Sequence, residues 1–230
     1  MTAPLDVLAK HFAAAPGSPR VILDIGAADG ADTVRYAEQF PSAPVLAFEP
    51  LPYNVEELKR ALEAKGLLDR VTVFQVALSD TDGETDFWVS GGEPPDKLAR
   101  LVGTAPGPRG WRYSSSMLEP LDHLKTFPWC TFEREAVPTR RLDTLLPHEG
   151  IDRIDFAHVD VQGAELQVLR GMGALLEETG AVWLEVSDHE LYRGQPLRHE
   201  VEEFMSSNGF ELAVSADGDR PQGDQLWIRG

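Results

Sequence analysis

Short apolar stretches alternate with amphipathic ones along most of the chain. The apolar stretches have the length and content of buried strands. They are residues 21–23, 45–49, 71–78, 154–161 and 181–186. Between them, apolar residues spaced three and four positions apart predict helices. These helices are residues 4–15, 31–40, 53–64, 164–176 and 197–207. The alternation predicts right-handed crossovers and a doubly wound, mostly parallel α/β sheet.

The end of the chain departs from this alternation. Residues 210–215 and 225–229 have strand patterns, and the turn-rich segment between them contains no helix. The last strand of a seven-stranded sheet is therefore predicted to be antiparallel, whereas a dinucleotide-binding sheet is usually parallel throughout.

The middle of the chain interrupts the pattern as well. Residues 84–90 alternate like one arm of a hairpin, and residues 91–130 are rich in Gly, Pro and Ser. Regular structure resumes at residues 136–146. A loop of this length inside a compact domain is usually a lid, a binding loop or disordered. We expect one domain over residues 1–230, with a lid or acceptor-binding insertion at about 91–130.

The first strand leads into a glycine-framed loop. Gly26 and Gly30 stand where the backbone must turn sharply or approach a ligand, although an ordinary tight turn is the alternative. The third glycine of the GxGxxG dinucleotide motif is missing, and Asp29 and Asp32 would repel a pyrophosphate. Glu49, 23 residues after Gly26, ends the second strand, where a carboxylate can accept hydrogen bonds from ribose hydroxyls. This combination favours S-adenosylmethionine, which is cationic and carries no phosphate.

Five segments together resemble class I S-adenosylmethionine-dependent methyltransferases, and more narrowly the FkbM-type methyltransferases. They are VILDIGAADG at 21–30, FEP at 48–50, ALSDTDG at 77–83, RRLDTLL at 140–146 and DFAHVDVQGAELQVLRG at 155–171. The resemblance covers about residues 20–215. The family pattern has a lysine and a glutamate where this sequence has His158 and Gln162.

The resemblance implies the class I methyltransferase fold and a set of cofactor-binding residues. Those at the methionine end would be Asp24, Gly26, Ala28 and Gly30. Glu49 would bind the ribose with Pro50 beside it. Ala77 and Leu78 would flank the adenine, with core packing as the alternative.

A hydroxyl acceptor must lose a proton during methyl transfer, which calls for a base. Asp160 ends the fourth strand beside the expected cofactor, and helix capping is its alternative role. His158 shares a strand face with Asp160 and is either a catalytic or a core histidine. Glu185 and His189, on and after the fifth strand, complete the catalytic candidates. Asp160, Glu185 and Asp188 are also a candidate Mg²⁺ ligand set, although the spacing leaves the metal unassigned.

The insertion holds the acceptor-binding candidates Arg112, Ser115 and Ser116. A run without acidic residues also contains Lys97, Arg100 and Arg109. Such a run favours an acidic acceptor, such as a phosphorylated or carboxylated sugar, and a solvated loop is the alternative.

Composition limits the partners and the compartment. The formal net charge of −17 disfavours nucleic acid and anionic membrane surfaces. No apolar run approaches the ~20 residues that a membrane span needs, and the first residues lack a signal-peptide pattern. The single cysteine, Cys130, is consistent with a reducing compartment. We expect a cytoplasmic protein that acts on a small-molecule or glycan acceptor.

These observations predict an S-adenosylmethionine-dependent O-methyltransferase acting on a sugar, a glycan precursor or a secondary metabolite. Two alternatives remain at this point. One is methylation of nitrogen or carbon on the same fold, and the other is a protein that binds the cofactor without catalysis.

Overall fold

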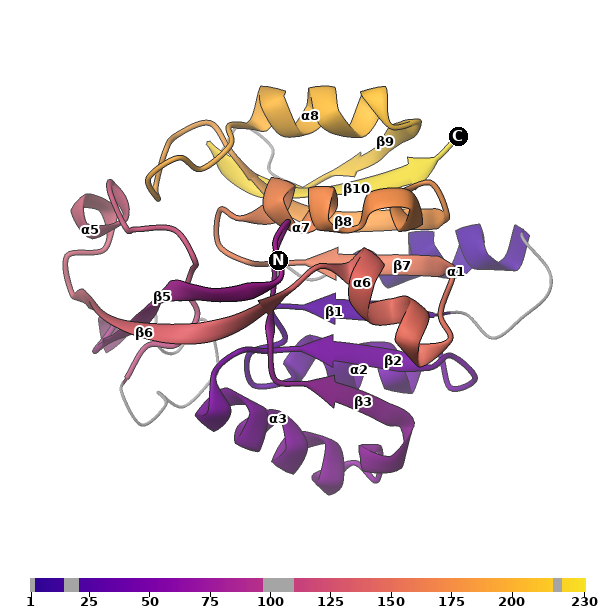
Figure 1. Cartoon of the computed structure of the whole chain (residues 1–230), viewed down its shortest axis with the longest axis horizontal. Coiled ribbons are helices and arrows are strands. Elements are labelled where there is room, and N and C mark those ends of the chain that lie inside the picture. Colours follow the sequence, from indigo (N-terminus) through magenta and orange to yellow (C-terminus); the bar gives the residue numbers. More distant parts are fainter. Residues whose placement is uncertain (1–2, 15–20, 97–109, 217–220) are drawn as a thin grey trace.

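The large sheet of the molecule has seven strands in the order β3-β2-β1-β7-β8-β10-β9 (Figure 1). The computed structural model describes residues 3–14, 21–96, 110–216 and 221–230. The strands are β1 (Ile22–Ile25), β2 (Val45–Phe48), β3 (Val71–Phe74), β7 (Ile154–Val159), β8 (Thr179–Ser187), β9 (Phe210–Ser215) and β10 (Gln222–Arg229). β10 is antiparallel to both β8 and β9, whereas the pairs among β3, β2, β1, β7 and β8 are parallel. The predicted doubly wound sheet with an antiparallel last strand is confirmed.

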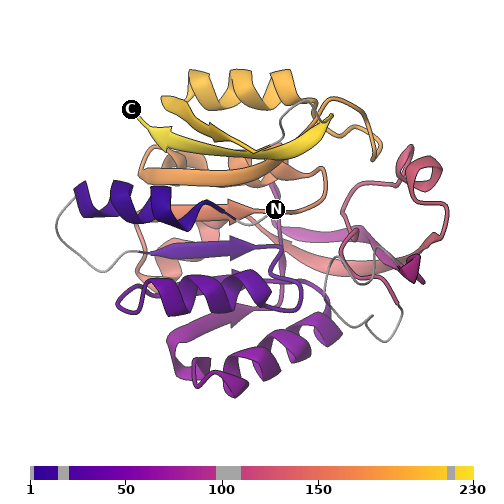
Figure 2. The ribbon, with the colours of Figure 1, turned by 180° about the vertical axis from the view of Figure 1, so that it is seen from behind.

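Helices cover both faces of this sheet (Figures 1 and 2). On one face lie α1 (Leu5–Ala14), α2 (Ala31–Gln39) and α3 (Pro52–Ala64), and on the other α6 (Leu142–Leu145), α7 (Glu165–Gly171) and α8 (Arg198–Ser207). Short 3₁₀ segments are η1 (Leu68–Arg70), η2 (Leu146–Glu149) and η3 (Gly173–Leu176). Ile22 packs into the first of these layers and its neighbour Leu23 into the second, because successive strand residues point to opposite faces. Burial on both faces explains why the strands are apolar without alternation.

One predicted strand proves to be two. The apolar run at 71–78 leaves the edge of the large sheet at Phe74, and β4 (Ala77–Leu78) pairs instead with β6 (Cys130–Arg140). Val76 and the two β4 residues stay buried after the break. Apolar residues therefore stand on both sides of the break, and a single exposed polar residue, Gln75, lies between them.

A smaller sheet, in the order β4-β6-β5, extends beyond the carboxyl ends of the parallel strands (Figure 1). β5 (Gly83–Gly92) confirms the hairpin arm expected at 84–90, and its antiparallel partner β6 begins at Cys130, six residues before the expected position.

Residues 110–130 of the predicted loop are anchored to this smaller sheet. They include the short helix α5 (His123–Thr126), and Trp88 and Ser116 exchange two backbone hydrogen bonds. Lys97, Arg100 and Arg109 lie outside the described residues.

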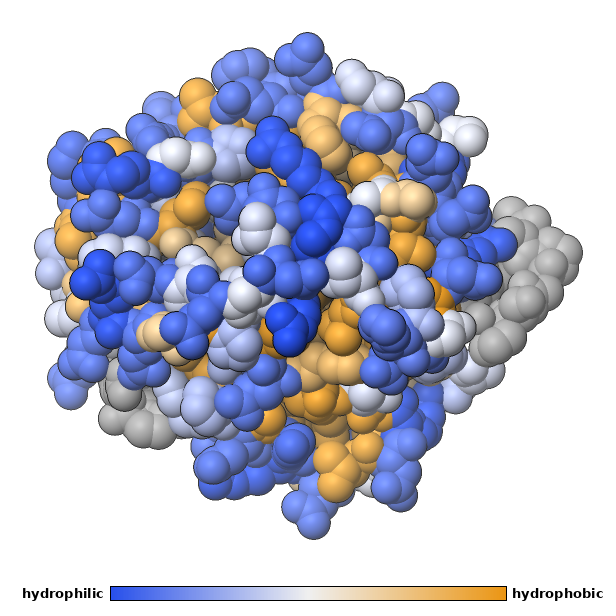
Figure 3. Space-filling model, in the orientation of Figure 1, coloured by the Kyte–Doolittle hydropathy of each residue, from blue (hydrophilic) through white to orange (hydrophobic). Residues whose placement is uncertain are grey.

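Hydrophilic residues cover most of the face shown in Figure 3, with smaller hydrophobic areas between them. Within the described ranges, no helix has both the length and the apolar content that crossing a membrane requires.

The ends of β1 and β7 meet at Gly26. Its φ of +88° lies in the left-handed region, and a Cβ on this residue would lie 1.9 Å from the carbonyl oxygen of Asp160. The amide of Asp160 donates to the carbonyl of Ile25 at 2.9 Å, so the two chain segments touch through their backbones. Glycine therefore allows the first loop and the residue after β7 to lie side by side.

Gly26→Ala is expected to destabilise the protein by about 3 kcal/mol, because an unfavourable φ and a backbone clash act together. Gly150→Ala is a matched control, since Gly150 also has a positive φ, +74°, but nothing lies within 4 Å of its Cβ position. The control should lose about 1 kcal/mol from φ alone. Urea unfolding measures both, and equal losses would show that the contact with Asp160 is unimportant.

Candidate active site

A cavity of about 640 Å³, including the part open to solvent, lies where the large sheet meets the smaller one. This volume is typical of small-molecule sites. Its lining comprises Ile25, Gly26, Ala28, Phe48, Glu49, Pro50, Asn54, Val76, Ala77, Leu78, Phe87, Arg112, Tyr113, Ser115, Met117, Asp160, Val161 and Gln162. Residues after β1, β2, β3 and β7 thus meet residues of the insertion, at the carboxyl edge where α/β sheets bind ligands.

Glu49 is the best-anchored of the predicted cofactor residues. The amide of Ala28 donates to Glu49 Oε2 at 3.0 Å, and the amide of Leu51 donates to Oε1 at 2.8 Å. Burial raises the pKa of Glu49 to about 7, although hydrogen bonds from Leu51, Asn54 and Ala28 act in the opposite direction. A carboxylate has about four acceptor positions, so at least one remains for a hydroxyl of a ligand beside these three donors.

The other predicted cofactor residues divide between the wall and the layer behind it. Gly26, Ala28, Pro50, Ala77 and Leu78 line the cavity.

Asp24 and Gly30 are not among the lining residues. Gly30 has a φ of +85° and lies against α3, where a Cβ would come within 2.4 Å of Leu58 Cδ1. Glycine at this position therefore serves helix packing.

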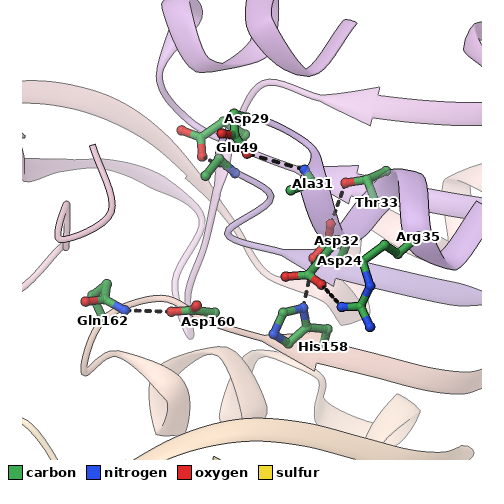
Figure 4. A network of polar contacts seen from close by, with 11 residues as sticks. Asp24, Asp29, Ala31, Asp32, Thr33, Arg35, Glu49, His158, Asp160 and Gln162 are labelled. Atoms are coloured by element: carbon green, nitrogen blue, oxygen red, sulfur yellow. Dashed lines mark hydrogen bonds and ion pairs between the residues drawn. The ribbon is translucent and has the colours of Figure 1, made fainter. Parts of the chain in front are cut away.

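Asp24 and His158 form a buried pair beneath the glycine loop (Figure 4). Asp24 Oδ1 lies 3.2 Å from His158 Nδ1, and Thr33 in α2 donates its hydroxyl to Asp24 Oδ2. Burial acts to lower the pKa of His158, but the hydrogen bond and charge of Asp24 outweigh it, so the pKa is raised. The pair links β1, β7 and α2, which fits the core alternative for His158 rather than contact with a substrate.

Asp160 lines the cavity, and its carboxylate is oriented by Gln162 (Figure 4). Gln162 Nε2 donates to Asp160 Oδ1 at 2.7 Å and approaches Glu185 Oε2 at 3.4 Å. Gln162 has a φ of +53°, and its carbonyl accepts the hydroxyl of Ser116 at 2.7 Å. A residue with strained backbone thus connects the end of β7, β8 and the insertion.

Glu185 lies behind Gln162 and is not among the cavity-lining residues. Its Oε1 accepts a hydrogen bond from Gln222 at 2.9 Å. Burial, followed by the negative charges of Asp160 and Glu165, raises the pKa of Glu185 well above its usual value. Glu185 therefore contacts the cavity wall through Gln162.

Glu165 secures the loop that follows β7. Its Oε1 accepts the amides of Gly163 at 3.0 Å and Val161 at 3.3 Å. Burial raises the pKa of Glu165 to about 7. This carboxyl group therefore holds the backbone that carries Asp160 and Gln162.

The predicted carboxylate set for Mg²⁺ is not assembled. Asp188 forms an ion pair with Arg198 at 2.7 Å. Its neighbour His189, which was a candidate base, is exposed and does not line the cavity. Among the residues that the structure describes, no cluster of three or more His, Cys, Asp or Glu side chains could hold a metal ion.

The insertion contributes the remaining wall. Of the three residues predicted to bind the acceptor, Arg112 and Ser115 line the cavity. Ser116 is fully buried behind them, where it contacts Gln162. Tyr113 also lines the cavity, and its hydroxyl donates to Asp29 Oδ2 at 2.8 Å, which joins the insertion to the glycine loop.

Sequence reasoning missed several wall residues. Asn54, Phe87, Met117 and Gln162 were not among the candidates. Asn54 could have been noticed as a polar residue on the apolar face of its helix, where it is 1% exposed. Met117 lies in a segment without periodicity and gave no comparable signal.

Comparison with known proteins gives a consistent result. The sequence matches the family described as "Methyltransferase FkbM domain" over residues 24–212. The 2-O-methyltransferase NoeI of Sinorhizobium fredii (strain NBRC 101917 / NGR234) is 39% identical over 180 residues, which cover 77% of this chain and 68% of NoeI. Methyltransferase sdnD of Sordaria araneosa is 29% identical over 210 residues, which cover 86% of this chain and 75% of sdnD.

Solved structures support the fold. An rRNA methylase from Streptococcus thermophilus superposes with a TM-score of 0.51 at 11% identity, covering 100% of this chain and 98% of that chain. At this identity the likeness shows the fold alone. The expectation that this chain has no nucleic-acid partner stays a prediction.

Glu165 should make stability depend on pH. The pKa of its carboxyl group is near 4.5 in the unfolded chain and about 7 in the folded protein, so its contribution to stability is lost as pH rises through 7. Relative to Glu165→Gln, the wild type should lose about 3 kcal/mol of unfolding free energy between pH 4.5 and 8. Urea titrations at several pH values measure this difference. Parallel curves for wild type and Glu165→Gln would contradict the assignment.

Proposed function

Because the chain belongs to the FkbM methyltransferase family, we propose that it transfers a methyl group from S-adenosylmethionine to a hydroxyl oxygen of a small-molecule or glycan acceptor. The observation that carries this proposal is that Glu49 and Asp160 both line the same cavity. One carboxylate suits a ribose diol and the other suits a reacting hydroxyl. The name of NoeI, a 2-O-methyltransferase, supports oxygen as the acceptor atom.

The residues present fit S-adenosylmethionine better than a dinucleotide. The amide of Ala28 already donates to Glu49, and the amide of Ala31 to Asp29. These loop amides are therefore committed to carboxylates instead of a pyrophosphate. The acidic side chains beside them attract a cationic ligand.

In this proposal the cofactor lies along the ends of β1, β2 and β3. Gly26 and Ala28 leave room for the methionine end because their side chains are absent or small. Glu49 accepts the ribose hydroxyls, and Pro50 closes that side. Ala77, Leu78, Phe48 and Val76 give the adenine an apolar wall.

When bound, S-adenosylmethionine supplies the electrophilic methyl group. The remaining work is done by this chain, which must hold the acceptor oxygen in line with the transferred carbon and remove its proton. Asp160 accepts that proton, and the hydrogen bond from Gln162 fixes the direction in which its carboxylate points. The walls contributed by the insertion exclude water and hold the acceptor.

The test of this function combines binding with product analysis. Calorimetry should detect binding of S-adenosylhomocysteine, and incubation with labelled S-adenosylmethionine and a panel of hydroxylated sugars should yield a labelled product. Mass spectrometry should locate the methyl group on oxygen. Failure of the wild type to bind either nucleoside would refute the proposal, and a methyl group on nitrogen would correct it.

The pKa of Glu49 should make the binding of S-adenosylhomocysteine depend on pH. The ionised carboxylate accepts hydroxyl hydrogen bonds better than the protonated form, and the pKa of Glu49 is about 7. The dissociation constant should therefore fall by up to about tenfold between pH 6 and pH 8. In Glu49→Gln, which keeps the shape without titrating, binding should be weaker and this decrease should disappear. A decrease of the same size in the variant would assign the titration to the ligand.

Asp160→Asn should separate catalysis from binding. Loss of the base should lower kcat by about 10²- to 10⁴-fold, while the dissociation constant of S-adenosylhomocysteine changes little. Asp188→Asn is the matched control, because Asp188 follows the neighbouring strand but pairs with Arg198. A large loss of kcat in the control, or none in Asp160→Asn, would disprove the assignment of Asp160 as base.

A further inference from the structure

Arg112 is a buried cation that has no counter-ion among the described residues. Its side chain is 8% exposed, it lines the cavity, and its Nε has no hydrogen-bond partner. Within the described ranges, no carboxylate forms an ion pair with its guanidinium group. Exposed arginines elsewhere in the chain do pair, as Arg134 does with Asp86 and Arg193 with Glu119.

This arrangement is unfavourable unless a ligand compensates it. A charged group removed from water loses its hydration, and an unmatched buried N–H loses a hydrogen bond as well. The carboxyl groups that line the same cavity, Glu49 and Asp160, are bonded to Ala28, Leu51 and Gln162 instead. The missing negative charge therefore has to come from outside the described chain.

The chemistry of the side chain defines the ligand. A guanidinium group carries five N–H donors in a rigid plane, which fits the paired oxygens of a carboxylate or phosphate. We propose that Arg112 binds a carboxylate or phosphate group of a molecule that enters the cavity. This inference rests on the proposed function, which supplies the two molecules that could carry the group.

One source is the carboxylate at the methionine end of the cofactor. The adjacent residue, Tyr113, is hydrogen-bonded to Asp29, which places this part of the insertion beside the glycine loop. The other source is an acidic group on the acceptor, since Ser115 and Met117 of the same segment line the cavity too. The two sources predict different effects of the same variant.

The first arm compares S-adenosylmethionine with its decarboxylated analogue, which differs by the carboxylate alone. If the cofactor supplies the anion, the wild type should bind S-adenosylmethionine at least tenfold more tightly than the analogue. Arg112→Met should remove this preference by weakening the binding of S-adenosylmethionine and leaving that of the analogue unchanged.

The second arm uses protein saturated with S-adenosylhomocysteine and titrates it with glucuronate, glucose 6-phosphate and glucose. If the acceptor supplies the anion, the wild type should bind the acidic sugars at least tenfold more tightly than glucose. Arg112→Met should abolish this difference, and its affinity for the nucleosides should equal that of the wild type.

Arg134→Met controls for the loss of an arginine from the surface, and it should match the wild type in both arms. Thermal unfolding checks that Arg112→Met is folded. Arg112→Lys keeps the charge but not the planar pair of donors, so it should retain part of the preference. If Arg112→Met does not fold, Arg112→Lys is used in its place in both arms.

A wild type that prefers neither S-adenosylmethionine over its analogue nor an acidic sugar over glucose would overturn the inference. So would a preference that survives in both Arg112 variants. If the wild type binds no nucleoside at all, the proposed function fails, and the sugar titration without nucleoside still decides the role of Arg112.

Discussion

The active-site architecture depends on the backbone contact between Gly26 and Asp160. A side chain at position 26 would overlap the carbonyl of Asp160, so glycine there lets the strands β1 and β7 end side by side. The loop proposed to approach the cofactor and the carboxylate proposed to face the acceptor thereby become neighbours on one wall. The pair of Asp24 and His158 reinforces this junction from below, because it binds the same two strands to α2.

Around this junction the protein has several buried carboxyl groups and few cations to pair with them. Burial raises the pKa values of Glu49, Glu165 and Glu185, and backbone amides and glutamine side chains, rather than cations, provide most of their partners. The part of the site around these groups is poorly suited to phosphate and well suited to a ligand that brings positive charge. Arg112 is the exception within the cavity wall, and its isolation there makes it informative.

The sequence was sufficient for the centre of the large sheet because β1, β2, β7 and β8 are buried on both faces and must be apolar. It was also sufficient to predict that Glu49 and Asp160 lie near each other at one edge of the sheet, because topology brings the carboxyl ends of parallel strands together there. It could not reveal the break after Phe74, since apolar residues stand on both sides of it, and one exposed polar residue, Gln75, is also what a half-buried strand would show. The choice between a catalytic and a core role for His158 stayed open, because strand alternation predicts which face a side chain is on but not how deeply it is buried. The burial of Arg112 depends on an insertion without periodicity, so no local pattern could predict it.

The two sheets that meet at the cavity have separate ladders of hydrogen bonds. The ends of β1, β2 and β7 in the seven-stranded sheet carry most of the side proposed for the cofactor, and β4 of the smaller sheet adds Ala77 and Leu78. Another part of the wall comes from Phe87 of β5 and from residues of the segment 110–130. A change of length or sequence at residues 110–130 therefore leaves the pairing of the large sheet intact. Evolution can alter the molecules that such a wall accepts without redesigning the machinery that holds the methyl donor, and loops on a rigid scaffold are where this freedom is used.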